Sequence, residues 1–249
     1  MTSEVQIPQD EDARKPARSK SRGVKLFIRD IILIFLAALL VSFLIKTFFI
    51  RSFYIPSASM TNTLQVNDRI IVNLLSPGMV PLKNGDVVVF TDPGGWLTAE
   101  APPSTSPVVS GFNDVLAFIG LSAPDSNDHL IKRVIGLPGD HVKCCNAFGQ
   151  LTVNGVPLDE PYIKLPANVT KAAPETFDIT VPKNDLWVMG DNRYQSADSA
   201  YHHQQDPGHE YVPISAVVGR AFVISWPVSR WSVLGDYPTT FSGVAKAKK

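Results

Sequence analysis

A single uninterrupted apolar stretch near the start constrains this chain more than any other feature. The fifteen residues from Ile31 to Ile45 carry no charge, and after Lys46 the apolar pattern continues to Ile50. A helix over Ile31–Ile50 would be about 30 Å long at about 1.5 Å per residue, enough to span the hydrocarbon layer if Lys46 reaches the interface. We therefore predict a membrane anchor over residues 26–50.

The flanks of this stretch decide between a cleaved signal peptide, a buried core helix and an uncleaved anchor. A cleavage site needs small residues, but residues 46–56 are mostly bulky. The positive-inside rule places the more cationic flank in the cytoplasm. We thus expect a single pass through the cell membrane, with the bilayer as a partner, residues 1–25 as a disordered cytoplasmic tail and the remaining chain outside. Seven cations precede the stretch and two follow closely: Arg14, Lys15, Arg18, Lys20, Arg22, Lys25 and Arg29, then Lys46 and Arg51.

Charge and cysteine content exclude several other classes. The 23 Lys and Arg residues balance 23 Asp and Glu residues, which argues against nucleic acid as a partner. Neighbouring Cα atoms lie about 3.8 Å apart, below the usual ~4.4–6.8 Å of a disulfide, so Cys144 and Cys145 cannot close an ordinary loop. Two buried thiols, a strained vicinal bridge and a redox switch remain as alternatives. Metal-ligand spacing is absent, and we expect no metal and no cofactor.

The chain beyond the anchor has the pattern of a mainly β protein. Asn154-Gly155 joins two short apolar runs as a two-residue hairpin turn, and no segment keeps a helical period over three turns. We expect a β core over residues 51–140 and 186–235, an insertion at 92–128, a small second β-lobe at 141–185 and a C-terminal tail at 236–249. The apolar run 112–121 within the insertion could form a hairpin or touch the membrane. The expected strands are short, β-branched or aromatic runs at residues 69–75, 86–90, 130–135, 186–189 and 217–225.

The first cluster with chemical potential follows the anchor directly, in Phe53-Tyr-Ile-Pro-Ser-Ala-Ser-Met60. Pro56 and small side chains leave backbone N–H groups free, which suits a serine nucleophile beside an oxyanion site. The same composition is typical of a plain linker. The five histidines stand in no G-x-S-x-G or H-E-x-x-H context, so a histidine-based triad is unsupported, though not excluded.

Lys132 is the second candidate, because it lies in a strand with apolar neighbours. Alternation places Lys132 on one face with Leu130 and Val134. If that face is the core, the amine loses solvation, its pKa falls and a neutral base becomes available. An edge-strand or snorkelling lysine is the alternative.

The third cluster, Met189–Ser199, closes a predicted strand in a dense run of Asp, Asn, Ser and Arg. Such residues favour a hydrogen-bonded turn. They would equally suit a loop whose serine and aspartates orient a neighbouring base.

Together these segments resemble the bacterial type I signal peptidases, membrane-bound Ser/Lys proteases. The matching motifs occur in order as Ile55-Pro-Ser-Ala-Ser-Met60, Asn84-Gly-Asp-Val-Val-Val-Phe90, Ile131-Lys-Arg-Val-Ile-Gly-Leu-Pro-Gly-Asp140 and Gly190-Asp-Asn-Arg193…Ser196-Ala-Asp-Ser199. The resemblance implies two antiparallel β-sheet lobes. It further implies Ser59 as nucleophile, Lys132 as general base, Ser57 in the oxyanion hole with the Ser59 N–H, and Ser196 as the hydroxyl that positions the lysine. By the same resemblance, Arg133, Asp191 and Asp198 brace the site, while Phe53, Ile55 and Ile131 line pockets for small residues of the Ala-x-Ala type.

Four positions depart from the family pattern. Tyr194 and Gln195 replace a second Asp-Asn, and Ala200 stands where arginine is usual, so the brace on Asp198 must differ. Ala58 replaces a common glycine.

The function that the resemblance implies is removal of signal peptides from exported preproteins by cleavage after small residues. Two alternatives remain: a self-cleaving repressor-type Ser/Lys protease, disfavoured by the anchor, and a non-catalytic membrane-tethered β-module that binds exported chains or cell-wall components.

Overall fold

The computed structural model describes residues 20–97 and 128–247, and it forms two compact units, Met1–Ser42 and Phe43–Lys249. Helix α1 spans Lys20–Phe48, and its segment Gly23–Phe48 is long and apolar enough to cross a membrane. The helix begins inside the range predicted as a tail, so that boundary is wrong for residues 20–25, where Lys and Arg favour helix. Residues 1–19 lie outside the described part of the chain.

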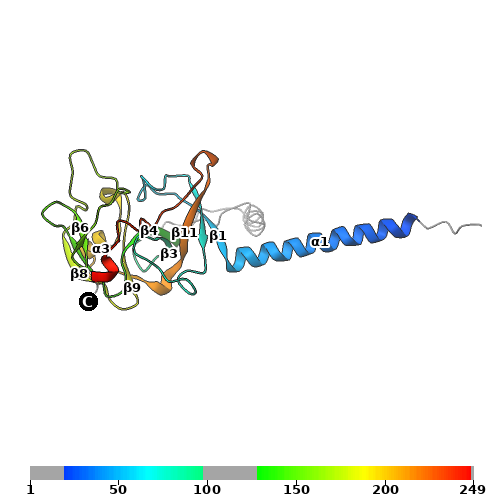
Figure 1. Cartoon of the computed structure of the whole chain (residues 1–249), viewed down its shortest axis with the longest axis horizontal. Coiled ribbons are helices and arrows are strands. Elements are labelled where there is room, and N and C mark those ends of the chain that lie inside the picture. The colour runs from blue at the N-terminus through cyan, green and yellow to red at the C-terminus, as the bar shows by residue number, and fades with distance from the viewer. Residues whose placement is uncertain (1–19, 98–127, 248–249) are drawn as a thin grey trace, which may run out of the picture. The chain divides into compact units, whose positions relative to one another are not determined.

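A large antiparallel sheet carries most of the second unit and confirms the mainly β fold class (Figure 1). Its order is β1-β2-β11-β3-β4-β9-β10, with β12 paired to β11. The strands are β1 Ile50–Tyr54, β2 Arg69–Asn73, β3 Val87–Thr91, β4 His129–Gly136, β9 Asp185–Met189, β10 Val212–Pro213, β11 Val217–Trp226 and β12 Ser232–Val233.

A four-stranded antiparallel sheet, in the order β7-β6-β5-β8, lies within the predicted small lobe. Figure 1 shows β6 and β8 at the opposite end of this unit from β1 and β11. Asn154 and Gly155 have φ values of 53° and 79°, which confirms the predicted hairpin turn. The strands are β5 His141–Cys144, β6 Leu151–Val153, β7 Val156–Pro157 and β8 Phe177–Thr180.

Short helices connect the strands, and none of them was predicted. Helix α3 begins in the loop after β9, where the Asp198 carboxylate accepts hydrogen bonds from the Ala200 and Tyr201 amides and thereby caps it. These helices are too short to show a 3.6-residue period in the sequence. They are η2 Arg193–Gln195, α3 Ser199–Gln205, η3 Ile214–Ala216, η4 Val228–Arg230 and α4 Val244–Ala247.

Both faces of the large sheet are buried around β3 and β4. Val87 and Val89 contribute to one apolar cluster together with Ile131, whereas Val88 contributes to another with Val134. Because side chains alternate along a strand, Lys132 falls on the face of Val134, opposite Val88 in the register. The alternation predicted from the sequence is therefore the one observed.

The predicted C-terminal tail packs against the protein. Phe241 and Val244 are buried, and the Thr240 hydroxyl donates to the Asp159 carbonyl at 2.7 Å. The side-chain amide of Asn154 donates through Nδ2 to the Val244 carbonyl at 3.2 Å. Describing residues 236–247 as a tail was wrong, because these two apolar side chains complete a core that the lysine-rich end conceals in the sequence.

The predicted insertion is described only at its ends, and its apolar run 112–121 lies outside the described residues. At its start, the Trp96 indole donates to the His209 carbonyl at 2.8 Å, and the Asp92 carboxylate accepts from the Gly94, Trp96 and Leu97 amides.

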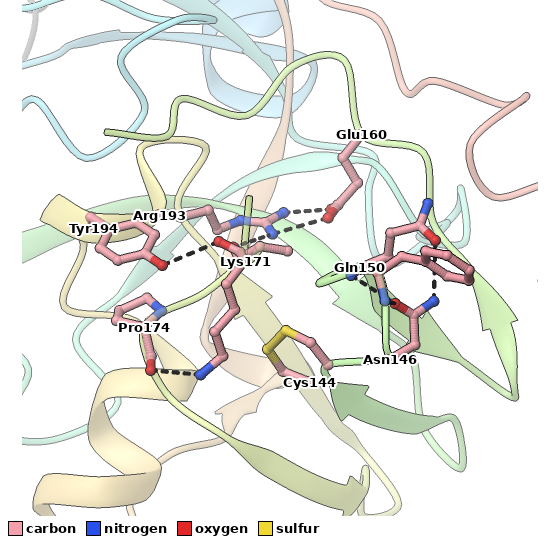
Figure 2. The surroundings of a disulfide bond; sticks show 11 residues. Cys144, Asn146, Gln150, Glu160, Lys171, Pro174, Arg193 and Tyr194 are labelled. Carbon is pink, nitrogen blue, oxygen red and sulfur yellow. Dashed lines mark hydrogen bonds and ion pairs between the residues drawn. A yellow bond between two sulfur atoms is a disulfide. The ribbon is translucent and has the colours of Figure 1, made fainter. Parts of the chain in front are cut away.

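Cys144 and Cys145 form a vicinal disulfide at the end of β5, one of the alternatives left open by the sequence. Figure 2 shows it beside the segment that contains Lys171 and Pro174. That segment is held by bonds from Lys171 Nζ to the Pro174 carbonyl and from the Tyr194 hydroxyl to the Lys171 carbonyl.

Replacing Phe241 by alanine is expected to destabilise the unit Phe43–Lys249 by about 3–5 kcal/mol, since a buried ring is lost from a packed site. Urea unfolding of the full chain in detergent measures this change. Phe148, with 83% of its surface exposed, is the matched control. Its alanine variant should unfold within about 0.5 kcal/mol of the parent. Equal effects at the two positions would contradict the packing of the C-terminal segment.

Candidate active site

Ser59 lies in the loop that follows β1, and this loop is fixed from both ends. The Ile55 amide donates to Asp68 at 2.9 Å, but Pro56 has no N–H and ends the ladder. Met60 and Leu64 are fully buried and anchor the far side of the loop. Ser57 remains exposed, whereas Ser59 is 7% exposed.

The structure brings the predicted nucleophile and base together. Lys132 Nζ lies 2.9 Å from Ser59 Oγ, and Ser57 Oγ lies 3.2 Å from the same atom. These are hydrogen-bonding distances, so the amine is in place to accept the serine proton when it is uncharged.

Lys132 occupies the centre of the sheet, on β4 between β3 and β9. Only 3% of its surface is exposed, so the alternative of an edge or snorkelling lysine is wrong. Burial lowers the pKa of Lys132 to about 8, against the opposing charges of Asp198 and Asp191. An amine with that pKa is neutral in about a tenth of the molecules at pH 7 and in about half at pH 8, a far larger share than for an ordinary lysine, whose pKa is about 10.4.

Asp198 is buried beside this amine, and burial raises the pKa of its carboxyl. Backbone amides hold the carboxylate in place. Gly190 N donates to Oδ2 at 2.9 Å and Ala200 N to Oδ1 at 3.1 Å.

Ser196 lies in the same region, where it is expected to contact the Lys132 amine. Its hydroxyl lies close enough to Asp198 to lower the pKa of that carboxyl. Its buried Oγ nevertheless makes no hydrogen bond of standard geometry to any residue in the described ranges. Its role as the group that positions Lys132 stays a prediction.

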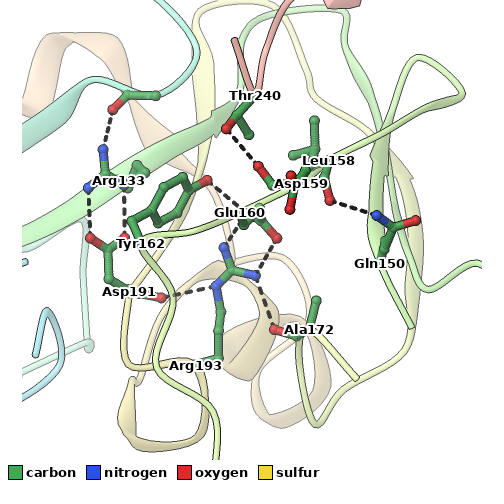
Figure 3. A network of polar contacts seen from close by, with 12 residues as sticks. Arg133, Gln150, Leu158, Asp159, Glu160, Tyr162, Ala172, Asp191, Arg193 and Thr240 are labelled. Atoms are coloured by element: carbon green, nitrogen blue, oxygen red, sulfur yellow. Dashed lines mark hydrogen bonds and ion pairs between the residues drawn. The ribbon is translucent and has the colours of Figure 1, made fainter. Parts of the chain in front are cut away.

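Arg133 and Asp191 form a fully buried, two-pronged ion pair (Figure 3). Arg133 Nε and Nη2 donate to the two carboxylate oxygens at 2.8 and 2.7 Å. The guanidinium lies 4.2 Å from the ring centroid of Tyr162, which favours the cation further. Burial acts to lower the pKa of Arg133, but Asp191 outweighs it and raises the pKa.

The loop after β9 also holds Ser59 through its backbone. Asn192 N donates to the Ser59 carbonyl at 3.0 Å, and Asn192 Nδ2 donates to the Ala58 carbonyl at 3.1 Å. Asn192 lies inside the fourth motif, but it was not selected because its bonds join residues far apart in sequence.

Arg193 and Glu160 form a second buried ion pair that sequence reasoning missed. Arg193 stands in the fourth motif, where its charge was a usable signal. Glu160 comes from the segment after β7 and had no such signal, since the partners are 33 positions apart.

Phe53, Ile55 and Ile131 pack in one buried cluster together with Met60 of the serine loop. They are thus brought close to Ser59, and their role in lining substrate pockets stays a prediction. Within the described ranges, no group of three His, Cys, Asp or Glu side chains could hold a metal ion.

Comparison with known proteins places this arrangement in a family. The family model described as signal peptidase, peptidase S26, matches residues 28–226. The chain belongs to this family.

Curated signal peptidases I resemble the chain over most of its length. The probable signal peptidase I of Mycobacterium leprae is 40% identical over 207 residues, covering 73% of this chain and 70% of the relative. Signal peptidase I of Mycobacterium tuberculosis is 38% identical over 241 residues, covering 90% and 79%. That of Leptolyngbya laminosa is 36% identical over 184 residues, covering 74% and 72%. The chain is therefore a peptide-bond hydrolase of the signal peptidase I type.

Gly190 tests how tightly this signal peptidase site is packed. A Cβ at Gly190 would lie 2.3 Å from Ser196 Oγ and 2.5 Å from the Ser59 carbonyl oxygen. Gly190→Ala should therefore displace the serine loop and lower kcat by about 100-fold, since a shift of about 1 Å in a reacting group has that effect.

Peptide-cleavage kinetics of the full chain measure this effect. Gly78→Ala is the control, because a Cβ there would meet only the Leu75 carbonyl oxygen at 4.0 Å. Parent-like kcat in Gly190→Ala would show that the site tolerates the extra carbon.

Proposed function

We propose that this protein is a membrane-anchored Ser/Lys endopeptidase that removes signal peptides from exported preproteins by cleaving after small residues. Membership of the signal peptidase family supports the removal of signal peptides. The observation that carries the dyad is the 2.9 Å contact between a buried lysine amine and a serine hydroxyl.

In the proposed mechanism, neutral Lys132 takes the proton of the Ser59 hydroxyl while Ser59 Oγ attacks the scissile carbonyl. The Ser57 hydroxyl and the Ser59 N–H stabilise the developing oxyanion. The lysine, now charged, protonates the leaving amine, and an acyl-enzyme on Ser59 remains. A water molecule activated by the neutral amine then releases the product. This chemistry requires no cofactor.

The apolar helix α1 and the signal peptidase relatives suggest a membrane-anchored enzyme. We place the N-terminus in the cytoplasm and the catalytic part outside, because the cations gather before the helix. The serine loop follows the anchor within about ten residues of chain. A substrate whose own apolar segment is still in the bilayer can then present its cleavage site to Ser59. The preference for small side chains at that site rests on the family resemblance, and Phe53, Ile55 and Ile131 lie in one cluster with Met60 of the serine loop.

Ser59→Ala should abolish cleavage of a signal-peptide-bearing substrate, with kcat lowered at least about 10³-fold because the nucleophile is lost. Cleavage by the detergent-solubilised, lipid-supplied protein is followed by mass spectrometry of the products. Ser242→Ala, at an exposed serine, serves as the control and should cleave like the parent.

Three outcomes are distinct. Cleavage after a small residue by the parent and the control alone supports the proposal. Equal cleavage by Ser59→Ala would require another nucleophile. Absence of cleavage by a folded parent would instead favour the binding module.

The pH dependence of kcat/KM should follow the ionisation of Lys132. Its pKa is lowered to about 8, and only the neutral amine accepts a proton. The rate should therefore rise with pH, by about tenfold per unit well below the midpoint, and level off above it. Stopped assays across the pH range measure the curve. A rate that stays flat from acid to neutral pH would contradict the neutral-amine mechanism.

A further inference from the structure

We propose that Glu160 is a positioning residue for the Ser59 nucleophile, acting through Arg193 and the backbone of Gly190. The inference rests on the proposed function and extends it into the segment after β7, a region to which the sequence assigned no role in the reaction.

Glu160 receives three donors in a buried site (Figure 3). Arg193 Nη1 and Nη2 donate to its two oxygens at 3.0 and 2.5 Å, and the Tyr162 hydroxyl donates at 2.8 Å. The side chains of Arg193 and Glu160 are 0% and 2% exposed. A carboxylate so enclosed is held in one geometry, since no water can replace a lost partner.

The remaining donors of Arg193 connect this pair to the loop after β9. Nη1 also donates to the Ala172 carbonyl at 3.0 Å, and Nε donates to the Gly190 carbonyl at 3.1 Å. Four N–H groups of this planar fork therefore donate to acceptors on three residues, Glu160, Ala172 and Gly190. Arg193 fixes the Gly190 carbonyl only while Glu160 fixes Arg193.

Gly190–Asn192 is the stretch that contacts the nucleophile. Gly190 has no room for a Cβ against the Ser59 carbonyl, and Asn192 N donates to that same carbonyl at 3.0 Å. A displacement of this stretch therefore moves Ser59.

The segment that carries Glu160 also contacts two loops, the one after β9 and the serine loop after β1. Lys164 N donates to the Asp191 carbonyl at 2.7 Å, and Asn62 Nδ2 donates to the Tyr162 carbonyl at 3.0 Å. Residues 160–164 thus connect the loop after β9 to the loop after β1. Glu160 lies in this connecting segment and pairs with Arg193 of the loop after β9.

The test compares Glu160→Gln and Arg193→Lys with Asp178→Asn in the full chain. Glu160→Gln removes the charge of the acceptor, while Arg193→Lys keeps the positive charge but lacks the fork that reaches Gly190. Asp178→Asn is the control. Asp178 lies on β8 of the four-stranded sheet and pairs with Lys143, and 52% of its side chain is exposed.

We expect kcat per folded molecule to fall about 10- to 100-fold in the first two variants, with KM within about threefold of the parent, because misplacement of the reacting group affects the chemical step. Asp178→Asn should match the parent. Assays run well below each variant's melting temperature separate this effect from a loss of folded protein. Hydrogen exchange at the Asn192 amide should accelerate in the two variants and stay unchanged in the control.

Parent-like kcat in both variants, or unchanged exchange at the Asn192 amide, would overturn the proposal. Should Glu160→Gln not fold, Arg193→Lys alone decides by the same two criteria, because it keeps the buried charges paired. The exchange measurement also distinguishes failure of the positioning role of Glu160 from failure of the proposed function. A parent that fails to cleave would defeat the proposed function, while exchange at the Asn192 amide would still report whether Glu160 positions the loop.

Discussion

Burial of one lysine amine against one serine hydroxyl is the constraint on which the rest of the site depends. Lys132 is almost completely shielded from solvent, so its charged form is disfavoured and its pKa is lowered to about 8. A neutral amine is useful only if its partner is held at hydrogen-bonding distance. The surrounding polar groups must also be paired, since an unpaired buried charge near Lys132 would move its pKa again.

The two arginines next to the site satisfy this condition in pairs. Arg133 is neutralised by Asp191, and Arg193 by Glu160. Burial acts to lower the pKa of Arg193, but the charge of Glu160 outweighs it and raises the pKa, so the cation persists. Asp198 lies beside the lysine and is held by backbone amides instead of by an arginine. Because each of the two arginines has its own carboxylate, the electrostatic potential at Lys132 depends on the geometry of these two ion pairs.

The sequence predicted those parts of the fold that local pattern determines. Alternation in β4 placed Lys132 on the face of Val134, and Asn154-Gly155 predicted its hairpin turn. The resemblance selected Ser59 and Lys132, which the structure brings into contact. Glu160 was missed because its partner depends on how the segment after β7 crosses the loop after β9, and no local period encodes that crossing. The prediction of a tail was wrong for residues 236–247 for a related reason, since Phe241 is apolar in isolation and becomes core only when folding places it in a buried cluster with residues of β5 and β6.

The same crossing brings the region between β5 and β9 against the loops that surround Ser59 and Lys132. Segmentation by sequence pattern separates residues 141–185 from the core, as though they were an appendage. Polar contacts nevertheless join this segment to the core. Lys164 N bonds to the Asp191 carbonyl, and the Tyr162 ring lies against the Arg133 guanidinium. Glu160 pairs with Arg193. Pairing of β4 with β9 brings Lys132 near the loop after β9, and Asn192 N of that loop bonds to the Ser59 carbonyl. Strand pairing does not by itself fix these groups to within a fraction of an ångström. That precision requires further contacts from outside the large sheet, and the segment after β7 supplies them through Glu160 and Tyr162.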